Sequence, residues 1–334
     1  MNCYCCNGEA KYFAKFHNKN RVVRRFRCQR CGKTFSEKQP LGGLRIESSQ
    51  VEQVVRLLCE GVGVRAASRL TGLHQETILN VLETVGEQCA QFHDKAVRNL
   101  KIANVETDEL YSFVHCKQER NKTGDEARGE QYTFLSFCRD SKLVISYNTG
   151  KRNRENATAH LGDLKNRVGN RFQLTTDNFK GYRHDGGAVC RTFGYNGVDY
   201  GMLSKKFAQS AFPQRRFSPP VCILFLRKPV LGNPDRDLIC TSHVERQNLN
   251  VRIFNRRFTR LTLGYSKKLE NLRHSVALFV CYWNFCWKHN TTKQSPAQGC
   301  GLADHVWSAR ELLSAISSTE STICETDGSQ SDRA

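Results

Sequence analysis

The chain changes its hydrophobic periodicity twice, and this succession limits the folds that it can adopt. Residues 48–95 carry apolar side chains at helical spacing, residues from about 103 to 177 alternate as in β-strands, and residues 242–290 are helical again. Within the strand region, a helix-like stretch at 154–169 separates the third strand from the fourth. The pattern predicts a mixed region of strands and helices, an α/β domain, behind a helical segment.

The charge balance favours an anionic partner. The 334 residues include 51 Lys and Arg against 32 Asp and Glu, a net charge of +19, which makes nucleic acid the first candidate. No apolar run is long enough to cross a membrane, and the first residues lack the apolar stretch of a signal peptide. Sixteen cysteines without secretory features indicate reduced thiols. We therefore expect a cytoplasmic protein associated with the nucleoid.

Two closely spaced cysteine pairs near the N-terminus predict a zinc site. Cys3 and Cys6 form one C-x-x-C pair, Cys28 and Cys31 form the other, and 21 residues lie between them. This is the spacing of a site in which four thiolates hold Zn²⁺ tetrahedrally, with Cys5 as a competitor of Cys6. The intervening residues resemble a β-hairpin, so the module would be a zinc ribbon.

The segment "VRAASRLTGLHQETILNVL" fits a helix-turn-helix. A first helix would end near Leu70, a turn would follow at Thr71 and Gly72, and a second helix would begin near Gln75. An ordinary helical hairpin is the alternative, but the position behind a basic zinc ribbon favours DNA binding. The polar side chains of the second helix that are expected to face outward and read base edges are Gln75, Thr77 and Asn80.

Three acids stand where strand or helix patterns meet polar residues. Asp108 lies in the first strand of the mixed region, Asp177 ends the fourth strand, and Glu245 opens the helix that follows. Three carboxylates on adjacent strands and one helix are what a two-metal site for phosphoryl transfer needs, because Mg²⁺ or Mn²⁺ takes oxygen ligands.

Each of these acids has a competing interpretation. Glu106 and Glu109 compete with Asp108, and strand alternation puts Glu106 on the same face as Asp108. The competing interpretation of Asp177 is an ordinary polar residue at the end of a strand, without a catalytic role. Ser242 and Glu245 have the spacing of a capping box, so Glu245 fits a residue that only completes a helix start.

Glu245 is also the one acid in a segment that is otherwise basic, "SHVERQNLNVRIFNRR". A solvated helix face usually pairs its cations with acids three or four residues away, and this segment does not. We therefore expect its arginines to bind DNA phosphates: Arg246, Arg252, Arg256 and Arg257.

Taken together, these segments resemble the DDE transposases of bacterial insertion sequences, and most closely the insertion-sequence-one family. The resemblance extends from about Cys3 to Glu311 and is carried by "VETDELYSFV", "LTTDNFKGY", "GNPD", "SHVERQNLNVRIFNRRFTRLTLGYSKK" and "SPAQGCGLADHVW". It implies an RNase H-like fold, with a mixed five-stranded sheet flanked by helices. It also assigns the three catalytic acids to Asp108, Asp177 and Glu245, which spacing alone left open.

The resemblance further implies a basic residue seven positions after the glutamate, which is Arg252 here. Seven residues are nearly two helical turns, so Arg252 returns to within about 20° of the face of Glu245. The implied cofactors are Mg²⁺ or Mn²⁺ at the acids and Zn²⁺ at the ribbon. The implied partners are double-stranded DNA, both element ends and target, and further copies of the chain, with no membrane and no small-molecule substrate.

The implied function is transposition: binding of the terminal inverted repeats, DNA cleavage and strand transfer. The alternatives are a DNA-binding regulator with an inactive RNase H-like domain, and a metal-dependent DNA nuclease. One segment, "FSPPVCILFLRKPV", is more apolar than expected between the second and third acids. The expected divisions are a zinc ribbon at 1–45, a helix-turn-helix at 46–98, the catalytic domain at 99–312 and a disordered Ser/Thr-rich tail at 313–334.

The cysteine spacing gives the first testable prediction. The purified protein should contain about one zinc ion per chain, because the two pairs supply the four thiolates of one tetrahedral site. A Cys28→Ser, Cys31→Ser variant should lose this zinc when its metal content is measured. Unchanged zinc content would contradict the assignment.

Overall fold

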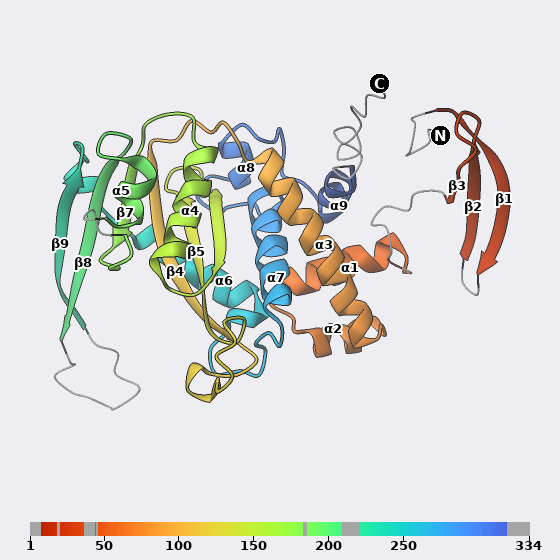
Figure 1. Cartoon of the computed structure of the whole chain (residues 1–334), viewed down its shortest axis with the longest axis horizontal. Coiled ribbons are helices and arrows are strands. Elements are labelled where there is room, and N and C mark those ends of the chain that lie inside the picture. Colours follow the sequence, from red (N-terminus) through yellow and green to blue (C-terminus); the bar gives the residue numbers. More distant parts are fainter. Residues whose placement is uncertain are drawn as a thin grey trace, which may run out of the picture.

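The computed structural model describes residues 8–18, 21–36, 44, 46–182, 186–208 and 221–318. These residues form a three-stranded sheet, a six-stranded sheet and a set of helices (Figure 1). Among them, no helix combines the length and apolar character that a membrane span requires.

The N-terminal sheet contains the predicted hairpin. Strands β1 (Ala10–Asn18) and β2 (Arg21–Cys28) pair antiparallel, and β3 (Thr34–Ser36) adds to the other edge of β2. Its only buried apolar side chains among the described residues are Ala10 and Cys28. A sheet with so small a core gains little stability from apolar burial.

The helices that follow occupy the segment with helical spacing, and the third begins at Gln75 as predicted. They are α1 (Ser48–Cys59), α2 (Val64–Thr71) and α3 (Gln75–Ala96). Gly72 ends α2 in the left-handed conformation, with φ of 72°, which a residue without a side chain adopts at little cost. The His74 side chain accepts the Glu76 amide and so caps the start of α3.

These helices share one core with the C-terminal part of the chain. Helix α3 packs against α7 (Leu269–Cys281) and α9 (Ala309–Ser318), and α1 packs against α9. Helix α9 continues to Ser318, so residues 313–318 are helical, although the tail was expected to begin at 313. Leu313 and Ile316 are buried in the shared core.

The large sheet is mixed, with the strand order β6-β5-β4-β7-β8-β9. Strands β4, β7 and β8 run parallel, whereas β5, β6 and β9 pair antiparallel with their neighbours. The bounds are β4 (Asn104–Val114), β5 (Gly129–Cys138), β6 (Val144–Gly150), β7 (Gln173–Asp177), β8 (Asp199–Ala208) and β9 (Val221–Leu231).

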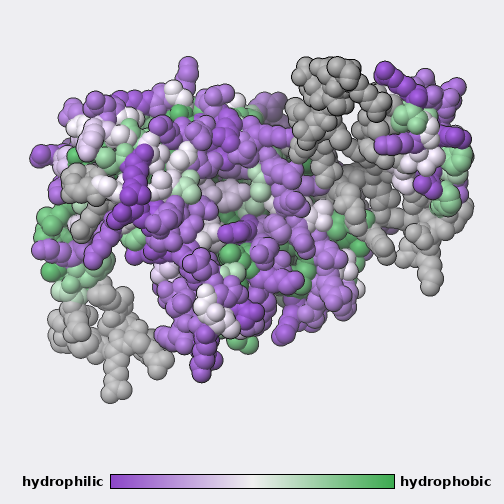
Figure 2. All heavy atoms as spheres, in the orientation of Figure 1, coloured by the Kyte–Doolittle hydropathy of each residue, from purple (hydrophilic) through white to green (hydrophobic). Residues whose placement is uncertain are grey.

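The expected number of five strands is wrong, because the sheet has a sixth strand, β9. This strand comes from the segment that was unexpectedly apolar, and its β-branched and aromatic residues favour an extended backbone. Ile223 and Phe225 on β9 and Phe207 on β8 are more than half exposed. Figure 2 shows this apolar surface at the β8 and β9 end of the molecule.

Helices cover both faces of the large sheet. On one face, α4 (Arg154–Arg167) and α5 (Ala188–Phe193) pack on apolar side chains of β4 to β8. On the other face, α6 (Ser242–Phe254) and α7 pack on β4, β5 and β6. Helix α4 provides the crossover between β6 and β7 (Figure 1).

Shorter elements complete the fold. In the part of the chain that the structure describes, they are 3₁₀ turns at Gln118–Arg120, Arg236–Leu238 and Arg256–Phe258, a π-helical turn at Tyr282–Cys286, and the short helix α8 (Pro296–Gly299).

The close packing of α3 on α7 gives a test of the shared core. A side chain at Gly86 would place its Cβ 2.5 Å from His274 Cβ and 2.7 Å from the His274 backbone oxygen. Gly86→Ala should therefore lower the free energy of unfolding, measured with urea, by about 1–3 kcal/mol. Gly162→Ala in α4 is the matched control, because its Cβ would meet no atom within 4 Å. It should be neutral or stabilise by up to about 1 kcal/mol, and equal effects of both variants would contradict the close packing.

Candidate functional site

The parallel pairing of β4 with β7 brings two of the predicted acids together. Thr107 on β4 is the register partner of Thr176 on β7, so Asp108 and Asp177 follow this pair on neighbouring strands. Burial raises the pKa of both carboxyls. The pKa of Asp108 rises to about 6, and the charge of Asp177 adds to the rise. Because burial disfavours their charged forms, a bound cation would stabilise both carboxylates, so the two acids form a possible cation site.

Glu109 is a third carboxylate at the same place. One carboxylate oxygen from each of Asp108, Glu109 and Asp177 lies within 4.8 Å of the others. The Glu109 side chain is only 2% exposed. Its burial, followed by the charge of Asp177, raises its pKa to about 7, against the opposing effects of Tyr182 and Arg152. In the sequence, Glu109 was an alternative to Asp108 as the acid of the site. In the structure, both residues belong to one cluster.

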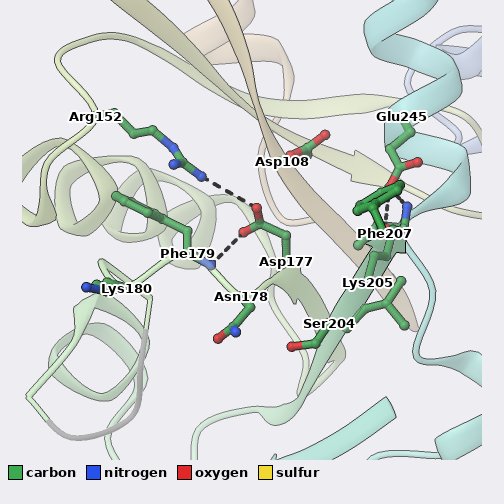
Figure 3. Close-up of a pocket in the computed structure, with 12 residues that line it drawn as sticks. Asp108, Arg152, Asp177, Asn178, Phe179, Lys180, Ser204, Lys205, Phe207 and Glu245 are labelled. Carbon is green, nitrogen blue, oxygen red and sulfur yellow. Dashed lines mark hydrogen bonds and ion pairs between the residues drawn. The ribbon is translucent and has the colours of Figure 1, made fainter. Parts of the chain in front are cut away.

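Arg152, in the loop between β6 and α4, lies against this cluster. Its Nε donates a hydrogen bond to Glu109 Oε2 at 2.9 Å. Its Nη2 lies 3.5 Å from Asp177 Oδ2, a contact that Figure 3 shows. The guanidinium also lies over the Phe179 ring, 4.1 Å from its centroid, and 5.7 Å from that of Tyr132. Cation–π contacts of this kind hold a guanidinium in a defined plane.

Glu106 holds the start of α6. Its Oε2 accepts the backbone amides of His243 and Val244, both at 3.0 Å, and its Oε1 lies 2.7 Å from His243 Nδ1. These are amides of the first turn, which have no partner inside the helix. Cys240 also offers a possible metal ligand beside Glu106 and His243, but both Glu106 oxygens already accept hydrogen bonds from α6.

The third predicted acid, Glu245, is not part of a capping box. Its Oε1 accepts a hydrogen bond from Thr241 Oγ1 at 2.6 Å and forms an ion pair with Lys205 on β8. The capping-box interpretation is therefore wrong, because the Ser242 amide, which Glu245 would accept in such a box, donates to Cys240 Sγ at 3.3 Å. Asn248, one turn further along α6, donates to Asp108 Oδ2 at 2.8 Å and ties the helix to β4 a second time.

Asp108, Asp177 and Glu245 line one open pocket of about 620 Å³. Figure 3 shows the three carboxyl groups, which come from β4, β7 and α6, around the same space. Three cationic side chains, two aromatic rings, a leucine and three polar side chains complete its wall: Arg152, Lys180, Lys205, Phe179, Phe207, Leu203, Asn178, Ser204 and Thr241. A pocket with clustered carboxylates and cations can take a divalent metal and an anionic substrate together.

The predicted arginines of α6 and the turn after it point in different directions. Arg246 and Arg256 are exposed, and Arg252 is half-buried. Burial and the charge of Arg260 lower the pKa of Arg252, and the charge of Asp108 opposes this. Arg257 turns inward, where Nη1 donates to Ser266 Oγ at 2.8 Å and burial lowers its pKa to about 10. Arg257 is thus not displayed on the surface with Arg246 and Arg256.

Of the remaining predicted residues, those that the structure describes do not line the pocket. Gln75 and Asn80 are exposed on α3, and Thr77 is half-buried. Cys28 Sγ accepts the amides of Arg30 at 3.3 Å and Cys31 at 3.4 Å. Cys3 and Cys6 lie outside the described residues.

Sequence reasoning missed Glu106 as the cap of α6, and Arg152 and Lys205 as partners of the acids. Their positions depend on the pairing of strands and on loops far apart in the sequence. For Glu109, in contrast, its position next to Asp108 in the sequence already indicated that it lies near the site.

A scan against protein-family models finds no match for this chain, and a search of curated proteins finds none either.

The contact of Glu106 with α6 can be tested by measuring how much it contributes to the stability of the protein. Glu106→Gln should lower the free energy of unfolding by about 1.5–3 kcal/mol, because a charge-assisted acceptor of two backbone amides is lost. The measurement is chemical denaturation followed by circular dichroism. Glu87→Gln, at an exposed position on α3, is the control and should change stability by less than about 0.5 kcal/mol. Equal stability of the two variants would show that Glu106 does not secure α6.

Proposed function

We propose that the protein is a DDE transposase, which binds the ends of its mobile element and catalyses metal-dependent DNA cleavage and strand transfer. The observation that carries the proposal is the convergence of Asp108, Asp177 and Glu245 on one pocket. They come from two neighbouring strands and a helix, and their order and positions are those that the family resemblance implies.

The donor set of the pocket fits Mg²⁺ or Mn²⁺. Asp108 and Asp177 offer hard oxygen ligands close together, and burial disfavours their charged forms unless a cation is near. Glu245 faces the same space and would complete the ligand set. When bound, the metal would supply charge stabilisation at the attacking and leaving oxygens of a phosphodiester.

The chain's own residues would bind and orient the DNA. Exposed Arg246 and Arg256, and half-buried Arg252, whose pKa the charge of Asp108 influences, would contact phosphates along α6, and Lys180 would do so at the pocket wall. The reaction would be hydrolysis at an element end, which frees a 3′-hydroxyl, followed by attack of this hydroxyl on target DNA. Glu106 and Asn248 would hold α6, so that Glu245 stays at the pocket.

The N-terminal parts would recognise the element ends. Amide hydrogen bonds to Cys28 Sγ suit a thiolate, so Cys28 and Cys31 fit a zinc site that Cys3 and Cys6 would complete. Helices α2 and α3 would form the helix-turn-helix, with Gln75, Thr77 and Asn80 toward the bases. Because two ends of one element must meet, we expect a homo-oligomer on DNA.

A strand-transfer assay tests the proposal. With Mg²⁺ and duplexes that carry the terminal sequences of the element, the wild-type protein should cleave and join DNA. Glu245→Gln, Asp108→Asn and Asp177→Asn should each lose at least about a hundredfold in rate, since a misplaced metal alone costs that much. Binding of the end duplexes should remain.

Two outcomes would contradict this proposal. Cleavage without joining would favour a metal-dependent nuclease, and a Glu245→Gln protein of near wild-type rate would remove Glu245 from the site. Glu87→Gln serves as the control and should remain active, because this carboxyl lies on the exposed face of α3.

A further inference from the structure

The candidate metal site already contains a cation of the protein itself. Arg152 contacts two of the three clustered acids, Glu109 and Asp177, and its side chain is 37% exposed at the wall of the pocket. On the other side of the pocket, Lys205 forms an ion pair with Glu245. The acids are therefore neutralised in part by side chains before any metal binds.

The two contacts of Arg152 differ in quality. Both Nε and Nη2 lie 2.9 Å from Glu109 Oε2, which is the distance of a good charge-assisted hydrogen bond. Nη2 lies 3.5 Å from Asp177 Oδ2, at the outer limit of a hydrogen bond. The Phe179 ring supports the guanidinium from one side. Arg152 can thus lose its contact with Asp177 and keep its hydrogen bond to Glu109.

A divalent cation on Asp108 and Asp177 would stand within a few ångströms of this guanidinium. The two positive charges would repel, and Asp177 could not satisfy both at full strength. We propose that Arg152 and the divalent metal compete for Asp177, and that Arg152, still held by Glu109, turns to a DNA phosphate when the metal binds. This inference rests on the proposed function, because it assumes that the pocket takes metal and DNA together.

A phosphate is the suitable new partner for the released guanidinium. The planar fork of arginine matches two phosphate oxygens, and Lys180 on the same wall adds positive charge. Metal binding would free Arg152 for the phosphate, and the phosphate would keep Arg152 away from Asp177. By thermodynamic linkage, each ligand would then raise the affinity for the other by the same factor.

The test measures Mn²⁺ binding to the DNA-free, zinc-loaded full chain by electron paramagnetic resonance. Arg152→Gln should bind Mn²⁺ about tenfold more tightly than wild type, within the range usual for coupled sites, because the competing cation is gone. Arg154→Gln is the matched control, since this exposed arginine lies two residues away and removes the same charge. It should change the affinity less than twofold. A side chain that only supports packing would give weaker metal binding when removed, never tighter.

A second measurement adds a random-sequence duplex, which stands for target DNA. For the wild type, the duplex should raise the Mn²⁺ affinity severalfold, and for Arg152→Gln this increase should be largely lost. A double variant, Arg152→Gln with Glu109→Gln, removes both members of the buried pair. It should also bind Mn²⁺ more tightly than wild type, so poor folding of the single variant does not decide the result.

The outcomes separate this inference from the proposed function. Wild-type Mn²⁺ binding that Asp177→Asn abolishes, with no tighter binding by either Arg152 variant, would overturn the competition and leave the metal site in place. No Mn²⁺ binding by any of these proteins would overturn both.

Discussion

The candidate site depends on the contact between the Glu106 carboxylate and the first turn of α6. Glu106 and Asp108 lie two residues apart on β4, so a single strand supplies both an acid of the pocket and the group that secures the helix carrying Glu245. A carboxylate that is 2% exposed is costly to bury, but Glu106 is compensated by two amides and His243. The positive end of the helix dipole adds to this compensation.

The other acids of β4 and β7 have fewer partners: Asp108 Oδ2 accepts from Asn248, and Asp177 Oδ1 accepts the Phe179 amide. Burial, followed by the charge of Asp177, raises the pKa of both Asp108 and Glu109, which means that their charged forms oppose folding near neutral pH. Arg152 offsets this only in part, because it reaches Glu109 closely and Asp177 weakly. Apolar side chains would stabilise this end of the sheet better. Local conflict of this kind is expected where function, and not stability, selects the residues.

Much of the fold was predictable because its signals are local. Gly72 ends α2, and alternation marked four strands of the sheet. Two strands of the sheet, β8 and β9, were missed, and the apolar run of β9 does not alternate. The end of α9 was missed because serines surround the buried Leu313 and Ile316. The partners of the acids were not predictable. Arg152 meets Glu109 across 43 positions, a contact that exists only once the strands pair.

The residues of the basic segment around Glu245 have different roles, because α6 directs their side chains to different sides. Its buried face packs on the sheet and directs Asn248 to Asp108, and beyond its end Arg257 turns inward to Ser266. Glu245 and Arg252 share a side of the helix, because seven residues at about 100° each fall only about 20° short of two full turns. Arg252 also lies near enough to Asp108 to feel its charge. On the proposed function, a phosphate drawn to Arg252 would thus arrive beside the acids that hold the metal.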